Sequence, residues 1–200
     1  MISVFNYLSL DSYFAGLNGE LDWFYSLPHD DEWYSYTHQQ AKASSTLIFG
    51  HTTYEMMKSY WPTEEALKMD PAMANAVNNS PKIVFSKTLK DVKEEKNWKY
   101  ITLHREINPD EIIKLKKKND MIILGSGTII QQFANLGLID EYFLVVVPII
   151  LGSGKSFFST LNRSVSGGKD VKRMNLILVE TKSFKNGVVL LHYTTLKNNK

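Results

Sequence analysis

The chain has 200 residues, a mass of 22.9 kDa and a formal net charge of +2, from 23 basic and 21 acidic side chains. This length predicts a single domain over residues 1–200, and so small a charge surplus does not indicate a nucleic-acid partner. The sequence has no cysteine, which excludes disulfides, thiolate metal sites and cysteine nucleophiles. Its longest apolar run, residues 142–151, is about half the length of a membrane helix, so we expect a cytoplasmic protein with no membrane partner.

Short β-branched runs alternate with helical patterns over the first two thirds of the chain. The first run, Ile2 to Leu10, is apolar on both faces, as expected of a strand inside a covered sheet. The patterns that follow predict, in chain order, a helix over 33–43, a strand over 46–49, a helix over 53–60, a helix in part of 64–77, and strands over 82–85 and 99–103. This alternation is typical of a parallel sheet built from βα units.

The middle of the chain continues the pattern. A helix is expected to begin at Pro109, and residues 121–124 form the next predicted strand. A helix is expected after that strand, ending near Gly137, because four apolar residues share one helical face: Ile129, Ile130, Phe133 and Leu136.

The last third of the chain changes character. Residues 141–150 predict a long strand, and the runs 176–183 and 188–195 flank Lys185-Asn186-Gly187, whose Asn-Gly pair is typical of a β-hairpin. We therefore predict one α/β domain with a mostly parallel central sheet, flanked by helices and completed by a C-terminal antiparallel hairpin. The long apolar strand suits a dimer contact as well as a core, so it leaves the oligomeric state open.

Small polar residues follow three of the predicted parallel strands. In α/β sheets, ligands bind beyond the carboxyl ends of the strands. Main-chain N–H groups at helix starts, together with hydroxyls, suit an anionic phosphate, and glycine lets the main chain approach it. The sequence thus indicates a phosphate-bearing ligand held by three turns: Gly50-His51-Thr52-Thr53, Ser86-Lys87-Thr88 and Gly125-Ser126-Gly127-Thr128.

Two more specific nucleotide-binding motifs are present only in part. The segment that begins at Gly125 has Ile130 where the dinucleotide-binding fingerprint needs its third glycine. Gly154-Lys155-Ser156 resembles the end of a Walker A loop, but Ile149 stands where the first glycine belongs. The five histidines show no zinc-binding spacing, so we expect no metal site.

Residues 11–31 lack clear periodicity and are rich in aromatic and acidic side chains. A segment of this length between regular elements is typical of a functional lid or of a disordered insertion, and its aromatic content favours the lid. Asp30 and Asp31 come just before a predicted helix, where acids also serve simply to cap the helix start. Among aromatic neighbours, desolvation is expected to raise the pKa of such a carboxyl toward that of a useful acid. The residues alone leave both interpretations open.

Two sets of segments occur in order along the chain. The first set is Met1-Ile2-Ser3, Leu10-Asp11, Gly16, Trp23, Leu27-Pro28, Phe49 to Glu55, Phe85 to Leu89 and Gly125 to Thr128. The second set is Ser9-Leu10-Asp11 and Pro148 to Gly154, followed by Phe157-Phe158. The first set resembles the dihydrofolate reductases, and the second makes the chain resemble more closely the riboflavin-biosynthesis reductase (RibD C-terminal domain) family in its stand-alone form. Together the two sets cover roughly residues 1–195.

The resemblance implies an NADPH-dependent reductase, often a homodimer, that transfers a hydride to a pyrimidine- or pterin-like substrate. It assigns the cofactor phosphates to the three turns named above and the substrate side to Leu10, Gly16 and Trp23. Asp30 aligns with the carboxylate that binds the pteridine ring in dihydrofolate reductase, which makes it the first candidate for binding or polarising a ring N–H. Asp11 is the second candidate.

Two residues depart from the family pattern. His51 stands where a basic residue usually follows Gly50, and Ser12 stands where a glycine usually follows Leu10-Asp11. These departures keep an alternative open, a dinucleotide-binding protein without turnover, either a regulator or a degenerate paralogue.

Overall fold

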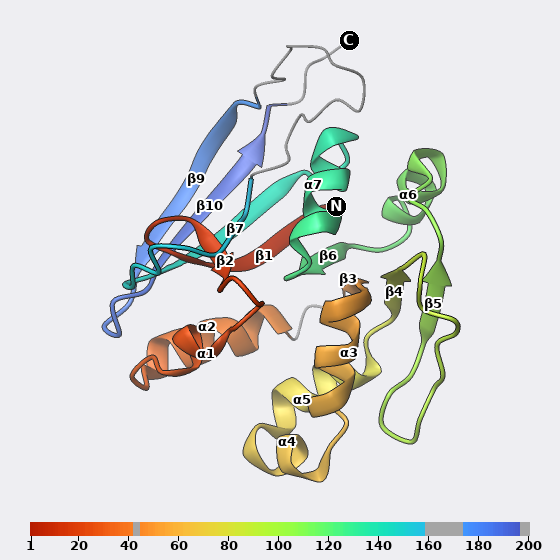
Figure 1. Cartoon of the computed structure of the whole chain (residues 1–200), viewed down its shortest axis with the longest axis horizontal. Helices are drawn as coiled ribbons and strands as arrows, with labels where there is room; N and C mark the ends of the chain where they lie inside the picture. Colours follow the sequence, from red (N-terminus) through yellow and green to blue (C-terminus); the bar gives the residue numbers. More distant parts are fainter. Residues whose placement is uncertain (42–44, 159–173, 197–200) are drawn as a thin grey trace.

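The computed structural model describes residues 1–41, 45–158 and 174–196 of the chain (Figure 1). Its main sheet is built from the strands β1 (Ile2–Ser9), β3 (Thr46–Gly50), β4 (Lys82–Phe85), β5 (Ile101–His104), β6 (Met121–Leu124), β7 (Glu141–Val147), β9 (Leu176–Ser183) and β10 (Val189–Thr195). They lie in the order β5-β4-β3-β6-β1-β7-β10-β9. Every pair from β5 to β7 is parallel, and β10 runs antiparallel to both β7 and β9. The predicted fold class is therefore confirmed.

The helices are α1 (Asp22–Tyr25), α2 (Asp31–Ala41), α3 (His51–Tyr60), α4 (Glu64–Met69), α5 (Pro71–Asn79), α6 (Pro109–Lys116) and α7 (Gly127–Asn135). Helices α6 and α7 pack on one face of the sheet through Ile112, Ile130 and Phe133. Helices α3 and α5 pack on the other face through Tyr54 and Val77, and α2 packs there beside β7 and β10. Figure 1 shows α2 and α3 separated at one end of the sheet, near the point where β3 and β6 end.

Several boundaries differ from those expected. Helix α2 begins two residues early, and positions 42 and 43 of the predicted helix lie outside the described residues. The helical pattern over 64–77 is two helices, because Asp70 caps the start of α5 and Pro71 occupies its first turn. The predicted strand 99–103 is shifted to Ile101–His104, since Tyr100 adopts a φ of 57°.

Short elements lie within the segment 11–31 that showed no periodicity. Besides α1, it contains β2 (Tyr13–Ala15), which pairs antiparallel with β8 (Lys155–Ser156) in a second, two-stranded sheet. Elements of two to four residues complete at most about one helical turn or one pleat, so periodicity cannot reveal them.

The long apolar strand β7 forms core within this chain. It lies between β1 and β10, and Tyr142, Val145 and Val147 are buried. It ends before Pro148, three residues earlier than predicted, because proline lacks the N–H that a ladder needs. The homodimer and the single domain over residues 1–200 stay predictions. Within the described ranges, no helix is long and apolar enough to cross a lipid bilayer.

Candidate functional site

A cleft of about 1420 Å³ opens at the carboxyl ends of β3, β4 and β6 and continues between α2 and α3. All the residues predicted to bind the cofactor phosphates line it: Gly50, His51, Thr52, Thr53, Ser86, Lys87, Thr88, Gly125, Ser126, Gly127 and Thr128. The cleft therefore exceeds the several hundred Å³ to about 1,000 Å³ usual for a pocket that holds one small ligand.

Ser126 joins the first of these turns to the third. Its hydroxyl accepts the main-chain N–H of Gly50 at 2.8 Å and donates to the Thr53 hydroxyl at 2.8 Å. Ser126 itself adopts the left-handed conformation, with a φ of 54°, directly after Gly125 at a φ of 57°. A non-glycine residue rarely adopts this backbone conformation, so the strained turn is held in place by the two hydrogen bonds.

The second turn is joined to the first through His51. The His51 Nδ1 atom lies 3.0 Å from the Thr88 hydroxyl oxygen. Ser86 is buried, and its hydroxyl accepts the N–H groups of Thr88 at 3.2 Å and Leu89 at 2.9 Å. The three turns that the sequence singled out therefore form one hydrogen-bonded rim.

Helices α3 and α7 both begin at this rim without a side-chain cap. By contrast, α4, α5 and α6 begin with Thr63, Asp70 and Asn108, whose side chains accept main-chain N–H groups. The first N–H groups of a helix lack intrahelical partners and carry partial positive charge. At α3 and α7 these donors face the cleft, where an anion can accept their hydrogen bonds.

Gly127, the first residue of α7, allows an aromatic ring to approach. A Cβ atom at this position would lie 2.6 Å from Cζ of Phe14. Phe14 belongs to β2 and also lines the cleft. The two-stranded β2–β8 sheet thus packs directly against the start of α7, as a lid over this end of the cleft would.

Asp30 lies at the cleft but acts as a cap. One carboxylate oxygen accepts the N–H groups of Glu32 at 2.9 Å and Trp33 at 3.0 Å, and the other accepts the N–H of Asn186 at 3.0 Å. The hydrogen bond from Trp33 is the main cause that lowers the pKa of Asp30, and with the other N–H donors it outweighs burial. The expectation that desolvation raises this pKa was wrong, because it counted burial without the N–H donors.

Asp11 is not among the residues that line the cleft. Its carboxylate accepts the Ser9 hydroxyl at 2.7 Å and the N–H groups of Leu151 at 3.1 Å and Gly152 at 2.7 Å. The hydrogen bond from Ser9 is the largest cause that lowers the pKa of Asp11. Asp11 therefore links the turn after β1 to the segment after β7 through hydrogen bonds.

The three residues predicted for the substrate side also lie away from the cleft lining. The Leu10 N–H donates to the carbonyl of Ile149 at 2.8 Å, and its side chain is exposed. Gly16 and Trp23 both donate to the carbonyl of Glu20, at 3.0 and 3.2 Å. Trp23 packs edge-on against Phe24 and so supports the cleft wall from behind.

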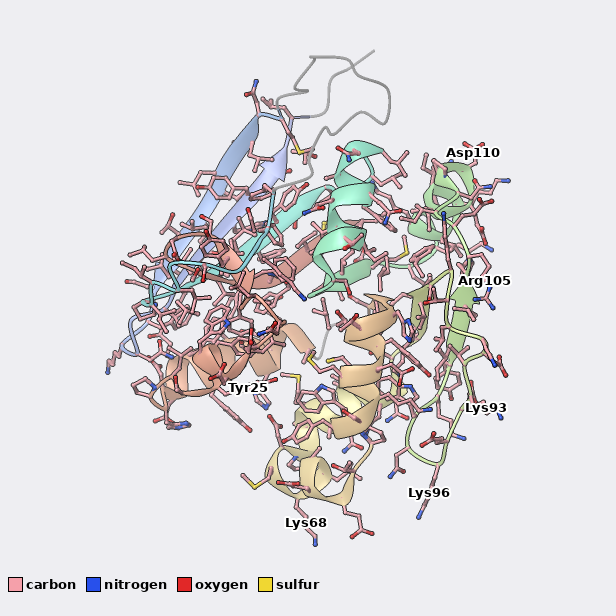
Figure 2. The ribbon with its side chains drawn as sticks, in the orientation of Figure 1. Tyr25, Lys68, Lys93, Lys96, Arg105 and Asp110 are labelled. Atoms are coloured by element: carbon pink, nitrogen blue, oxygen red, sulfur yellow. The ribbon has the colours of Figure 1, made fainter. Side chains whose placement is uncertain are left out.

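An aromatic wall lines part of the cleft, and no sequence motif marked it. Tyr7 stacks on Phe24 with ring centroids 4.6 Å apart, and Phe24 contacts Tyr25 at 4.4 Å. Trp33 contacts Tyr7 edge-on at 6.1 Å. Burial raises the pKa of Tyr7, so its phenol stays neutral. Figure 2 shows Tyr25 pointing from α1 into the space between α2 and α3. Such a wall suits the face of a flat heterocyclic ring.

Two further polar groups at the cleft were missed. His38 Nε2 lies 2.8 Å from Asp70 Oδ1, which joins α2 to the start of α5. Arg105, which follows β5, donates to the main chain of the turn after β4. The partners are 32 and 15 to 19 positions apart in sequence, and neither contact has a sequence signature. Over the described residues, no three His, Cys, Asp or Glu side chains are grouped as a metal site would need.

The chain belongs to the RibD C-terminal domain family, whose model matches residues 1–190. It is similar to the uncharacterized protein YyaP of Bacillus subtilis (strain 168), with 31% identity over 189 residues that cover 93% of this chain and 90% of that protein. The family match and the solved structures described next confirm the predicted resemblance to the RibD and dihydrofolate reductase families.

Two solved structures show the same fold. A putative riboflavin biosynthesis protein from Shewanella sp. PV-4 is 24% identical, with a TM-score of 0.71, over 98% of this chain and 99% of that chain. A dihydrofolate reductase from Enterococcus faecalis, complexed with NADP(H), is 16% identical, with a TM-score of 0.59, over 98% and 96%. The fold of this protein is therefore dihydrofolate-reductase-like.

Proposed function

We propose that the protein is an NADPH-dependent reductase that transfers a hydride to a C=N or C=O carbon of a pyrimidine- or pterin-like substrate. One observation supports this most strongly. The turns at residues 50–53, 86–88 and 125–128 are hydrogen-bonded into one rim, on a cleft whose other side is an aromatic wall. Such a rim suits the phosphates of a dinucleotide, and such a wall suits a flat substrate ring.

The residues of the rim fit a pyrophosphate group. Gly125 has a φ of 57°, and at Gly50 a Cβ would lie 3.1 Å from Ile129 Cγ1, so both positions favour the residue that lets the main chain approach a ligand. The uncapped starts of α3 and α7 add N–H donors. We assign the pyrophosphate to the turns at 50–53 and 125–128 and the adenosine 2′-phosphate to the turn at 86–88.

NADPH, when bound, supplies the hydride. The protein orients the substrate and excludes water from the reacting carbon. Tyr7, Phe24 and Trp33 would hold the face of the substrate ring. Because its pKa is lowered, the Asp30 side chain is a carboxylate at neutral pH. It would accept a ring N–H and fix the ring's orientation, and it would not serve as the acid that supplies a proton.

The proposal is tested by titrating NADPH and NADH against the intrinsic tryptophan fluorescence of the protein. Ser126→Ala removes the hydroxyl that joins two turns, so we expect it to raise the Kd for NADPH by about tenfold. Ser59→Ala is the control, because the Ser59 hydroxyl donates only to its own helix, at Met56 O. Failure of NADPH and NADH to bind the wild-type protein would contradict the proposal.

Turnover is tested separately by following NADPH oxidation with dihydrofolate and with 5-amino-6-(5-phosphoribosylamino)uracil. NADPH oxidation with either compound supports the reductase and shows whether its substrate is pterin-like or pyrimidine-like. Tight NADPH binding without oxidation would instead support the alternative, a dinucleotide-binding protein without turnover. One feature favours that alternative: the Asp30 carboxylate already accepts the N–H groups of Glu32, Trp33 and Asn186.

A further inference from the structure

Arg105 braces the turn that follows β4. It comes directly after β5, whose last residue, His104, is paired with Phe85 at the end of β4. Its Nη1 donates to the carbonyl oxygen of Ser86 at 3.1 Å and to that of Leu89, and its Nη2 donates to the carbonyl oxygen of Lys90 at 2.9 Å. Figure 2 shows Arg105 beside β5, at the edge of the molecule. One guanidinium therefore holds three main-chain carbonyls of residues 86–90, which we call the β4 turn.

The same turn is held from within. The Ser86 N–H donates to the carbonyl of His104 at 3.0 Å, and the Ser86 hydroxyl accepts the N–H groups of Thr88 and Leu89. These contacts involve the main chain and the Ser86 side chain, and none involves the Lys87 amino group. In the part of the chain that the structure describes, Lys87 is exposed, lines the cleft and has no ion-pair partner.

The two cations differ in what they can bind. Arg105 directs three of its five N–H donors at carbonyl oxygens, and both hydrogens of Nη1 are used. Lys87 presents an ammonium with three donors to the cleft, and Thr88 beside it lines the cleft as well. A doubly charged phosphate that enters this side of the cleft would meet the lysine of the turn, while the arginine holds the turn in shape.

We propose that Arg105 is a positioning residue that sets the preference for NADPH over NADH, by fixing the β4 turn so that Lys87 faces the 2′-phosphate. This inference rests on the proposed function. The 2′-phosphate is the group by which NADPH differs from NADH, so a residue that acts through Lys87 affects one nucleotide and spares the other. The planar fork of Arg105 matters because its two terminal nitrogens donate in fixed directions, Nη1 to Ser86 and Leu89 and Nη2 to Lys90, and a lysine has a single nitrogen in place of this fork.

The test measures Kd for both nucleotides by tryptophan fluorescence in Lys87→Gln, Arg105→Lys and the double variant. Lys87→Gln and Arg105→Lys should each raise the Kd for NADPH by about tenfold and leave the Kd for NADH within about twofold. The double variant should be no weaker than Lys87→Gln alone, since Arg105 acts through that side chain. Lys90→Gln is the control, because it removes a lysine charge from the same turn at a side chain that does not line the cleft.

Three outcomes would overturn the inference while leaving the proposed function intact. The first is full retention of the preference for NADPH in Arg105→Lys, the second is addition of the two losses in the double variant, and the third is an equal rise in the Kd for both nucleotides. Additive losses would make Arg105 a direct phosphate ligand. If the wild-type protein binds neither nucleotide, the proposed function fails and this inference fails with it.

A second measurement needs no nucleotide. If the guanidinium braces the turn, hydrogen exchange at the amides of Thr88 and Leu89 should become faster in Arg105→Lys, and exchange in α7 should not change. Arg105 is exposed, so the variant is expected to fold. Unchanged exchange at residues 86–90 would show that the arginine does not hold this turn.

Discussion

The Asp30 carboxylate accepts the main-chain N–H of Asn186 at 3.0 Å, which ties the start of α2 to the tip of the β9–β10 hairpin. The two residues are 156 positions apart in the sequence. Helix α2 carries Trp33, which packs between Phe5 and Phe184. This one carboxylate therefore helps to set the position of the aromatic wall against the sheet, whatever part it takes in substrate binding.

Replacing Asp30 with Asn should reduce both turnover and stability. The amide keeps one acceptor oxygen, so at least one of the N–H groups of Glu32, Trp33 and Asn186 loses its partner. Turnover should fall sharply while the Kd for NADPH stays nearly unchanged, because none of these hydrogen-bond partners of the carboxylate belongs to the rim formed by the three turns. Steady-state kinetics at a temperature where the variant is fully folded will measure this, and an unaltered kcat would remove Asp30 from the mechanism.

The same substitution has a pH signature. The folded-state pKa of Asp30 is lowered, so its contribution to stability is fully present above the unfolded value of about 4 and is lost as the pH falls through the folded value. Urea unfolding between pH 3 and pH 6 should therefore show that the free energy of unfolding falls less toward acid pH in Asp30→Asn than in the wild type. Asp31→Asn is the matched control, since the Asp31 side chain is 99% exposed. An equal fall in the free energy of unfolding toward acid pH in both variants would show that Asp30 is not the source of this pH dependence.

Gly127→Ala should disturb the contact between the start of α7 and the β2–β8 sheet. The added methyl would lie 2.6 Å from Cζ and 2.7 Å from Cε1 of Phe14, so the ring or α7 must move. Overpacking of this kind costs about 1–3 kcal/mol. We expect a matching drop in the free energy of unfolding and weaker NADPH binding. Phe14→Leu in the same chain should restore most of the stability, because the contact is with the ring edge. Gly137→Ala is an instructive contrast, since a Cβ there meets no atom within 4 Å and only the φ of 67° opposes it.

The hydrogen-bonded rim was predictable from sequence because its residues directly follow strands. A run such as Met121 to Leu124 fixes where the strand ends, and the parallel sheet then brings Gly125, Gly50 and Ser86 to the same edge. Local sequence was sufficient here, since each turn lies at the end of its own strand. The three-dimensional step needed only the rule that carboxyl ends of parallel strands meet at one edge.

The surroundings of the two candidate carboxylates were not predictable in the same way. The carboxylates of Asp11 and Asp30 look alike in sequence, yet Asp11 binds the segment after β7 and Asp30 binds the hairpin tip. The hydrogen bonds that lower their pKa values most come from nearby residues, Ser9 for Asp11 and Trp33 for Asp30, but further N–H donors come from residues 140 and 156 positions away. The contacts of Arg105 could not be predicted from the sequence either, because they depend on the β4 turn, which lies next to Arg105 in the sheet. Long-range partners of this kind carry no local pattern.

Lys82 gives the fold a stability that rises with pH. Its ammonium is buried at the start of β4, donates to the carbonyls of Asn78, Ser80 and Lys99, and lies 4.4 Å from the ring centre of Trp98. Burial is the main cause that lowers the pKa of Lys82 to about 8. Between this value and the unfolded value of about 10.4, the unfolded chain binds more protons than the folded chain, so the free energy of unfolding increases with pH.

The rise should amount to roughly 1.5 kcal/mol between pH 8 and pH 9.5, measured by urea unfolding. Tyrosine ionisation does not affect stability in this pH window. Burial raises the pKa of Tyr142 to about 12, and this lowers the free energy of unfolding only above the ordinary tyrosine pKa of about 10. Lys82→Met should abolish the rise, even though the three carbonyls left without a donor make the variant less stable overall. Lys93→Met, at an exposed lysine, should keep it. A rise of equal size in Lys82→Met would show that other groups cause it.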